Sequence, residues 1–265
     1  MTTISIIIPA FHAQETLLRA VASLKAQTYA AWQAVLVSDD GFDYAAFLAG
    51  LGFSDPRLVF TSTGRTGSGC HQARNAGLPL ITGEALSWLD ADDAYAPQRL
   101  ERLWPLARAH GAAADLLACL DAQTGERLFP EPSDEGAVHL LDLEGFMQLD
   151  QPVSPLMMRE FIEPRLEGVE LAEDVVANIR LLDRLQALAL LQAELYSYYI
   201  RRGSLAHSDQ SGERFEAAYA LYLARLQTGD GFGLTQKGRM IAIAGFARKQ
   251  ALNHAFETSR KTNRT

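Results

Sequence analysis

The sequence predicts an α/β protein with an open, mostly parallel central sheet flanked by helices and a helical C-terminal extension. Apolar strand-like runs alternate with amphipathic helical patterns through residues 1–110. Several of those runs end abruptly in polar or acidic residues, as strands do at the ligand-binding edge of such sheets. The final part of the chain carries only helical periodicity.

The composition narrows the class of protein. A chain of 265 residues allows one large domain, or one domain with a helical appendage, and 48% hydrophobic residues are ample for a packed core. The net charge of −8 disfavours nucleic-acid binding. No apolar run approaches the roughly 20 residues of a membrane span, and the N-terminus lacks the features of a signal peptide. Cys70 and Cys119 lie far apart in the chain, so we expect a reduced, cytoplasmic protein.

The elements of the first half follow in a regular order. β-Branched runs are typical of parallel strands covered on both faces, and apolar residues three to four apart indicate the covering helices. These patterns predict a strand at Ile4–Ile8 that Pro9 ends, a helix at Thr16–Gln27, a strand at Ala34–Val37, a helix at Ala45–Leu51, a strand at Leu58–Phe60, a helix that ends at Gly77, a strand at Ala85–Leu89 and a helix at Pro97–Ala109.

The second half is less regular. Its patterns predict strands at Asp115–Cys119 and Glu126–Phe129, a loop at Pro130–Gly136, helices at Leu140–Leu149 and Glu173–Leu191, a strand at Leu195–Ile200, and helices at Ser211–Gln227 and Thr235–Thr258.

Acidic residues follow two of the predicted parallel strands. Asp39–Asp40 come after the second strand, and Asp90, Asp92 and Asp93 come after the fourth. Because ligands bind beyond the carboxyl ends of such strands, we expect Pro9–Phe11 and these acids to share one edge. Carboxylates there suit Mg²⁺ or Mn²⁺, especially when the ion also holds substrate phosphates. The alternative is a solvated acidic turn in which an Asp caps the next helix.

Five short motifs occur together in a recognisable order. They are Ser5–Ile8 with Pro9–Phe11, Glu15–Leu17, Ser23–Leu24 and Ala26–Tyr29; Asp39–Gly41; Ala73–Gly77; Leu89–Asp93; and Ala172–Asp174, followed by Tyr198–Arg202, Gly203–Leu205 and Ser208. On these motifs the chain resembles the family 2 glycosyltransferases from about residue 4 to residue 208. Leu89–Asp93 corresponds to the family's DXD motif. Phe42 stands where the family's DDGS element has Ser, and His12 stands near where the family often has Asn.

The resemblance implies a GT-A, Rossmann-like domain over residues 1–208 and a helical extension over residues 209–265. Residues 1–110 would form the nucleotide-binding half and residues 111–208 the acceptor half. The implied reaction moves a sugar from a nucleotide-diphospho-sugar to an acceptor hydroxyl with inversion, in polysaccharide or glycoconjugate synthesis. UDP is the preferred nucleotide, with GDP and dTDP left open. The implied acceptor is a saccharide or a lipid-linked saccharide.

The resemblance also assigns roles on the donor side. Asp39 would accept a hydrogen bond from the uracil N–H, Asp90 would face the ribose, and Asp92 would hold Mn²⁺ or Mg²⁺. The other expected nucleotide-binding residues are Pro9, Ala10, Phe11, Glu15, Arg74 and Ala91.

On the acceptor side, Asp174 is the expected catalytic base. The expected contacts to donor, acceptor or diphosphate are Asp93, Glu173, Arg202, Ser204 and His207.

Other classes fit less well. A receiver domain needs a Lys after a late strand, yet no Lys occurs from Ala26 to Leu234. A phosphatase of the Asp-x-Asp-x-Thr type needs Thr where Ala94 stands, and an EF-hand loop needs Gly where Tyr95 stands. A non-catalytic protein that binds sugar nucleotides is the alternative from a different class, and Asp92 with Asp174 argues against it.

The C-terminal segment is basic. From Lys237 onward the chain contains seven Lys and Arg residues and a single acidic residue, Glu257. We expect peripheral contact with an anionic membrane surface, with a solvated helix face as the alternative.

Overall fold

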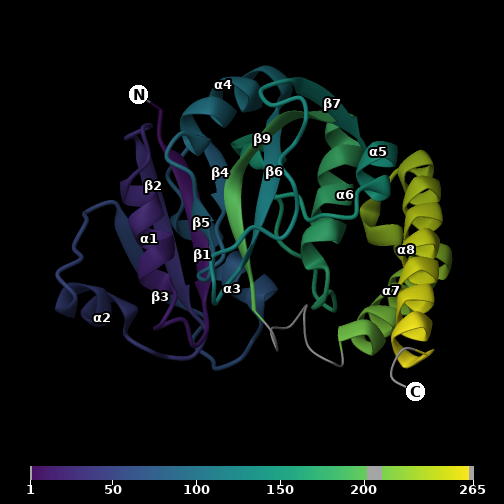
Figure 1. Ribbon diagram of the computed structural model, residues 1–265, viewed down its shortest axis with the longest axis horizontal. Coiled ribbons are helices and arrows are strands. Elements are labelled where there is room, and N and C mark those ends of the chain that lie inside the picture. Colours follow the sequence, from purple (N-terminus) through teal and green to yellow (C-terminus); the bar gives the residue numbers. More distant parts are fainter. Residues whose placement is uncertain (1, 202–210, 263–265) are drawn as a thin grey trace.

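The computed structural model describes residues 2–201 and 211–262, with side chains described as far as residue 255. Its centre is a mixed sheet in which the order is β3-β2-β1-β4-β8-β6-β9-β5, with β7 paired to β9 (Figure 1). The strands are β1 (Ile4–Ala10), β2 (Trp32–Ser38), β3 (Leu58–Ser62), β4 (Ala85–Trp88), β5 (Ala94–Tyr95), β6 (Ala112–Asp121), β7 (Val138–Asp142), β8 (Leu156–Met158) and β9 (Ala187–Ile200).

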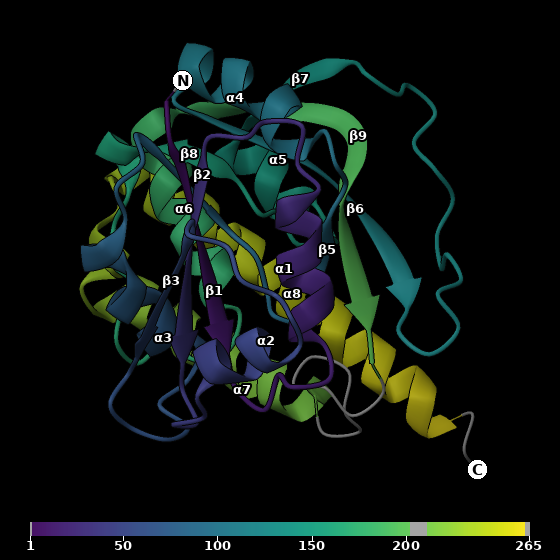
Figure 2. The same cartoon turned by 90° about the vertical axis from the view of Figure 1, so that its left-hand side faces the viewer.

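Helices cover both faces of this sheet, as Figure 2 shows for α1 and α3 on either side of β1. The α-helices are α1 (Leu17–Lys25), α2 (Tyr44–Gly50), α3 (Cys70–Gly77), α4 (Arg99–His110), α5 (Leu143–Gln148), α6 (Glu173–Leu185), α7 (Ser211–Thr228) and α8 (Gln236–Thr262). Alternate residues of β1 enter opposite cores, because strand side chains alternate between faces. Ile6 and Ile8 pack with α1, whereas Ile7 packs with α3.

The first half has the predicted parallel order. β1 pairs in parallel with β2 and with β4, and Ile7 lies beside both Val35 and Trp88. At the carboxyl edge, Asp39 N–H donates to the Ala10 carbonyl at 2.8 Å. The α/β prediction is confirmed. The prediction that Pro9 ends the first strand is wrong, because Pro9 lies within β1 opposite Val37. A proline lacks only the amide donor, so its neighbours still pair.

The second half brings antiparallel pairs into the sheet. β8 runs antiparallel to both β4 and β6, while β6 and β9 are parallel, with irregular register after Asp115 and Leu116. β5 and β7 each run antiparallel to β9. The sheet is therefore mixed, with its parallel pairs concentrated from β3 to β4.

Three predicted elements need correction. Glu126–Phe129 is not a strand, since only an isolated bridge joins Arg127 to Leu120. The predicted helix at Leu140–Leu149 is split, because residues up to Asp142 belong to β7 and the Asp142 carboxylate then caps α5 by accepting from Gly145 N–H at 2.8 Å. The predicted helix at Glu173–Leu191 ends at Leu185, and the apolar residues that follow enter β9.

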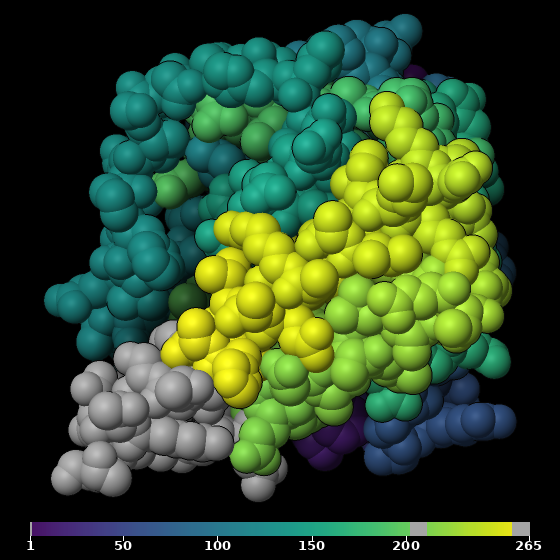
Figure 3. Space-filling view, turned by 90° about the vertical axis from the view of Figure 1, so that its right-hand side faces the viewer, coloured from purple at the N-terminus to yellow at the C-terminus, as the bar shows by residue number. Residues whose placement is uncertain are grey.

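The C-terminal helices pack against the rest of the chain. α7 and α8 lie side by side on one face of the molecule (Figure 3). Phe246 of α8 is fully buried and lies 5.5 Å, between ring centres, from the buried Tyr222 of α7. Within the described part of the chain, no helix combines the length and apolarity that a membrane span requires.

Candidate active site

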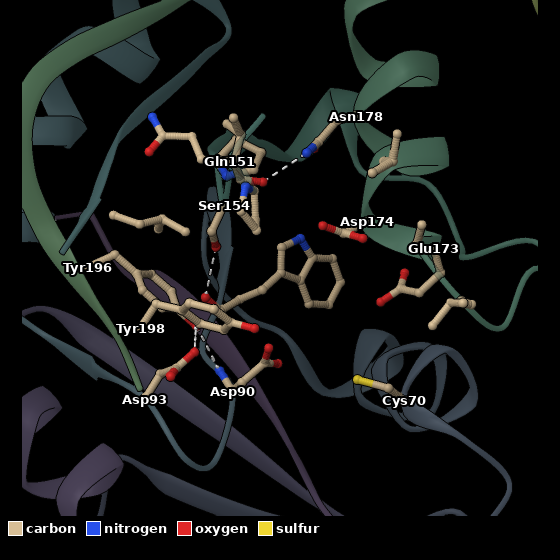
Figure 4. Close-up of a pocket in the computed structure, with 18 of the residues that line it drawn as sticks. Cys70, Asp90, Asp93, Gln151, Ser154, Glu173, Asp174, Asn178, Tyr196 and Tyr198 are labelled. Carbon is tan, nitrogen blue, oxygen red and sulfur yellow. Dashed lines mark hydrogen bonds between the residues drawn. The ribbon is translucent and has the colours of Figure 1, made fainter. Parts of the chain in front are cut away.

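A cavity of about 520 Å³ opens where the carboxyl ends of β4 and β9 face the start of α6. Asp90, Asp92 and Asp93 line it from the loop after β4, and Glu173 and Asp174 line it from α6. In Figure 4, Asp90 and Asp93 lie on one side of this space and Asp174 on another. Carboxylates from the two halves of the chain therefore share one cavity.

The acidic loop presents its side chains unequally. The side chains of Asp90 and Asp92 are 40% and 31% exposed, whereas Asp93 is 1% exposed. Asp93 accepts hydrogen bonds from the Tyr196 hydroxyl and from the Tyr199 N–H, each at 2.9 Å. Burial, with the nearby charges of Asp90 and Asp92, raises the pKa of Asp93 well above its usual value. Asp93 thus anchors the loop to β9, while Asp90 and Asp92 remain accessible.

Asp92 is held from two directions. Its carboxylate pairs with Arg201 at 3.0 Å, and its carbonyl accepts a hydrogen bond from Arg19. Arg19 also lies 3.5 Å above the ring centre of Tyr199. Burial and the charge of Asp90 raise the pKa of Asp92, and Arg201 opposes this shift. A carboxylate whose proton affinity is raised by a neighbouring negative charge is a favourable partner for a cation.

These oxygens fit a divalent cation that also binds substrate. In the described residues, no cluster of three His, Cys, Asp or Glu side chains could hold a metal ion unaided. Mg²⁺ is commonly bound by one or two carboxylates together with substrate phosphates. Asp92, with Asp90 beside it, offers that smaller donor set.

Two buried arginines connect the halves of the site. Arg74 of α3 pairs with Asp90 at 2.6 Å and also with Glu173, and Arg165 pairs with Glu173 at 2.8 Å. Asn75 fixes the backbone of Arg165, accepting its N–H at 2.7 Å and donating to its carbonyl at 2.9 Å. Burial and the charge of Arg74 lower the pKa of Arg165 to about 9. Glu173 is therefore the shared counter-ion of two cations, a connection that the sequence patterns did not predict.

Asp174 is placed by the start of α6. Ala172 precedes the helix in the left-handed region, with φ of 53°, so the chain turns sharply before Glu173. Glu173 is buried against the arginines, whereas Asp174 is partly exposed and lines the cavity. A carboxylate in the first turn of a helix interacts favourably with the helix dipole, so this position suits Asp174.

The predicted nucleotide edge lies next to this cavity. Pro9, Ala10, Phe11, Glu15, Asp39 and Ala91 are not among the residues that line the cavity itself. Phe11 and Glu15 are exposed, and Phe11 has 49% of its surface accessible. The buried Asp39 carboxylate accepts hydrogen bonds from Thr63 Oγ1 and Gly69 N, each at 2.8 Å. Asp39 thereby orders the glycine-rich loop that leads to Cys70 on the cavity wall.

Some functional predictions fall beyond the described residues: Arg202, Ser204 and His207 all lie in residues 202–210. Other residues at the site were missed. Tyr196 and Arg165 gave no signal beyond an aromatic strand and an isolated basic residue in a loop.

An α/β sheet with an acidic loop after β4 and a second pair of carboxylates on the opposite wall defines a protein of the GT-A class. The sequence profile described as Glycosyl transferase family 2 matches residues 5–161, more than half of the chain. The chain belongs to glycosyl transferase family 2.

Two relatives illustrate the range of similarity. The succinoglycan biosynthesis protein ExoO of Rhizobium meliloti (strain 1021) is 28% identical over 269 residues, covering 92% of this chain and 73% of that protein. The UDP-Glc:alpha-D-GlcNAc-diphosphoundecaprenol beta-1,3-glucosyltransferase WfgD of Escherichia coli is 35% identical over 98 residues. That match spans 37% of this chain and only 38% of WfgD, well short of two thirds of its length.

Solved structures share the fold. The crystal structure of Staphylococcus aureus TarS 1-349 in complex with UDP-GlcNAc superimposes with a TM-score of 0.72 over 92% of this chain and 71% of that chain. Sequence identity is 16%, so this likeness concerns the fold.

Proposed function

We propose that this protein transfers a sugar from a UDP-sugar to an acceptor hydroxyl with inversion, assisted by Mn²⁺ or Mg²⁺. The observation that carries the proposal is that Asp174 lines the same cavity as Asp90 and Asp92. A sugar bound between these walls would have the leaving diphosphate on one side and a general base on the other.

The donor side follows from the accessible acids. Asp92 would hold the cation, with Asp90 beside it facing the ribose. When bound, the cation would supply neutralisation of the charge that develops on the departing diphosphate. Arg74 supports this arrangement, because its ion pair with Asp90 at 2.6 Å fixes the position of that carboxylate.

The acceptor side follows from Asp174. Its carboxylate would take the proton of the acceptor hydroxyl as that oxygen attacks the anomeric carbon from the face opposite the diphosphate. The bond from the anomeric carbon to the diphosphate oxygen breaks, and UDP leaves with that electron pair. This single displacement inverts the anomeric centre and needs no covalent intermediate on the enzyme.

The relatives support the choice of donor and setting. WfgD carries UDP-Glc in its name, and the TarS structure contains UDP-GlcNAc. ExoO is named for the biosynthesis of succinoglycan, a polysaccharide. We therefore favour a UDP-hexose donor and a role in cytoplasmic polysaccharide or glycoconjugate synthesis.

Membrane contact through the basic C-terminal segment remains a proposal. Several of its cations are already engaged: Lys249 donates to the Leu149 carbonyl at 2.8 Å, Arg248 pairs with Asp150 at 3.2 Å, and Arg239 donates to the Leu226 carbonyl. Co-sedimentation with anionic and neutral vesicles tests the idea, and equal pelleting with both would dismiss it.

The direct test of function is calorimetric titration with UDP-glucose, UDP-galactose and UDP-GlcNAc in the presence of Mn²⁺, followed by assays of donor hydrolysis. Binding that requires the cation, with slow release of UDP, supports a transferase. Cation-dependent binding without any release of UDP by the protein would instead indicate a non-catalytic binding protein. No binding of any UDP-sugar would remove the proposal.

A further inference from the structure

The C-terminal helices take part in the cavity although the family profile ends before them, at residue 161. Phe215 and Tyr219 of α7 and Lys249 of α8 line the same space as Asp174. Phe215 and Tyr219 stand four residues apart, so they occupy one face of the helix. The helical extension is therefore a wall of the candidate site.

The two aromatic rings form a fixed surface. Their centres lie 5.8 Å apart with planes at 33°, and both side chains are partly exposed. Behind them, Tyr219 lies 5.8 Å from the ring of Phe246, which is fully buried in the core between α7 and α8. An aromatic ring held from behind offers an apolar face at little cost in conformational entropy.

Polar groups line the same cavity as these rings. Asp150, Gln151 and Asn178 line the same cavity, and Asn178 is held by donating to the Val153 carbonyl at 2.8 Å. Carboxylates and amides offer the acceptors and donors that hydroxyl groups need. A long hydrocarbon chain would leave these groups without partners, at an energetic cost. A ring with hydroxyls at its rim and C–H groups on its face matches both features.

We propose that the ring of a saccharide acceptor stacks on Phe215 and Tyr219, which form a platform for it. A hydroxyl of the stacked acceptor is thereby presented to Asp174. This inference rests on the proposed function. The platform and the base are close enough to interact. Burial, together with the charge of Asp174, raises the pKa of Tyr219 to about 12. The acceptor is accordingly recognised as a saccharide through its ring, whether or not a lipid is attached to it.

The test is saturation-transfer difference NMR on the full chain with UDP and Mg²⁺ present, because Mg²⁺ is diamagnetic and does not broaden the proton signals. The probes are the methyl glycosides of glucose, galactose and N-acetylglucosamine, with farnesyl phosphate as the lipid probe. Irradiation of aromatic protons should give signals from the ring protons of at least one glycoside. Phe215→Ala and Tyr219→Ala should each reduce that signal at least several-fold, whereas Tyr219→Phe, which keeps the ring, should retain it.

Matched controls separate stacking from general damage. Leu221→Ala changes a residue of the same helix that is 54% exposed and does not line the cavity, so it should leave the signal unchanged. Signal from farnesyl phosphate alone, no signal from any glycoside, or equal signals in wild type and Tyr219→Ala would overturn the proposal. Calorimetry with UDP-sugars on the same samples reports on the proposed function separately, because donor binding does not depend on the platform.

Discussion

The Tyr196 hydroxyl donates a 2.9 Å hydrogen bond to the buried Asp93 carboxylate and accepts the Asp90 N–H at 3.2 Å. One side chain of β9 thus holds two positions of the acidic loop. Asp93 also lines the cavity, but its buried carboxylate is engaged in holding the loop, whereas the side chains of Asp90 and Asp92 remain accessible.

Removal of that hydroxyl should loosen the acidic loop. Tyr196→Phe leaves the buried Asp93 short of one donor, which costs about 1–3 kcal/mol in the free energy of unfolding. We also expect weaker cation-dependent binding of UDP, because the backbone of Asp90 loses a partner. Urea unfolding and calorimetry measure the two effects. Tyr29→Phe is the matched control, since its hydroxyl donates to the Thr2 carbonyl elsewhere. Equal losses in both variants, with UDP binding intact, would contradict the account.

The buried ion pair beneath the loop should be sensitive to loss of one partner. Arg99 and Asp115 are both fully buried and lie 2.8 Å apart, and Arg99 also stacks 4.1 Å from the ring centre of Tyr95. Arg99→Met should cost about 3–5 kcal/mol of stability, because it leaves Asp115 charged and buried without its counter-ion. Urea denaturation measures this cost.

A double variant provides the internal check. Arg99→Met with Asp115→Leu should be less destabilised than the sum of the two single changes, because no unpaired charge remains. Strict additivity would show that the pair is not coupled.

The sequence predicts the parallel half well because its signals are local. β-Branched runs such as Ile4–Ile8, and helical spacing of Leu17, Val21 and Leu24, each depend on neighbouring residues alone. The run Leu188–Leu191 is wrongly predicted as helix, because a continuous apolar segment suits a buried helix or a buried strand equally. Gln186, with φ of 72°, separates α6 from β9. Glutamine is not a residue type that predicts such a break.

The candidate site, too, can be predicted from the sequence only in part. The rule that ligands bind beyond the ends of parallel strands is enough to bring Asp90 and Asp92 to one edge. The roles of Tyr196 and Arg165 depend on contacts with Asp93 and Glu173 that only the folded chain creates. Such pairings carry no local pattern, so sequence reasoning could not reach them.

The stability of the loop beside the nucleotide edge should depend on pH through Asp40. Burial alone would raise the pKa of Asp40, but the N–H groups of His12 and Phe42 and the hydroxyls of Tyr44 and Ser38 donate to it and lower the pKa overall. A carboxylate with a lowered folded pKa stabilises the fold above its unfolded pKa. That stabilisation disappears as the pH falls through the folded pKa.

The variant Asp40→Asn tests the direction of this pH dependence of stability. The variant should be less stable than wild type by about 1–3 kcal/mol at pH 7, since hydrogen bonds to a charged acceptor are lost. The difference should begin to shrink as the pH falls below about 4, the unfolded pKa, and should vanish below the lowered folded pKa, where the wild-type carboxylate is also neutral. Unfolding free energies between pH 7 and pH 3 measure the trend, and a difference that stays constant over this range would refute the explanation.

Asp92 should control dependence on the cation. Asp92→Asn removes the charge that would hold Mn²⁺ and leaves Arg201 without its 3.0 Å partner. We expect the affinity for UDP measured with Mn²⁺ to fall to the level that wild type shows with EDTA. Asp150→Asn, at another acid of the cavity wall, is the control and should keep the response to Mn²⁺. An undiminished effect of Mn²⁺ in Asp92→Asn would remove this residue from the metal site.

The central claim is that Asp174 is the base that activates the acceptor opposite the donor. The most direct measurement is the rate of sugar transfer by Asp174→Asn, with UDP-sugar affinity determined on the same protein. The account predicts a fall in rate of about 10²–10⁴-fold with donor affinity retained, because only proton transfer is lost. Transfer at close to the wild-type rate would contradict it.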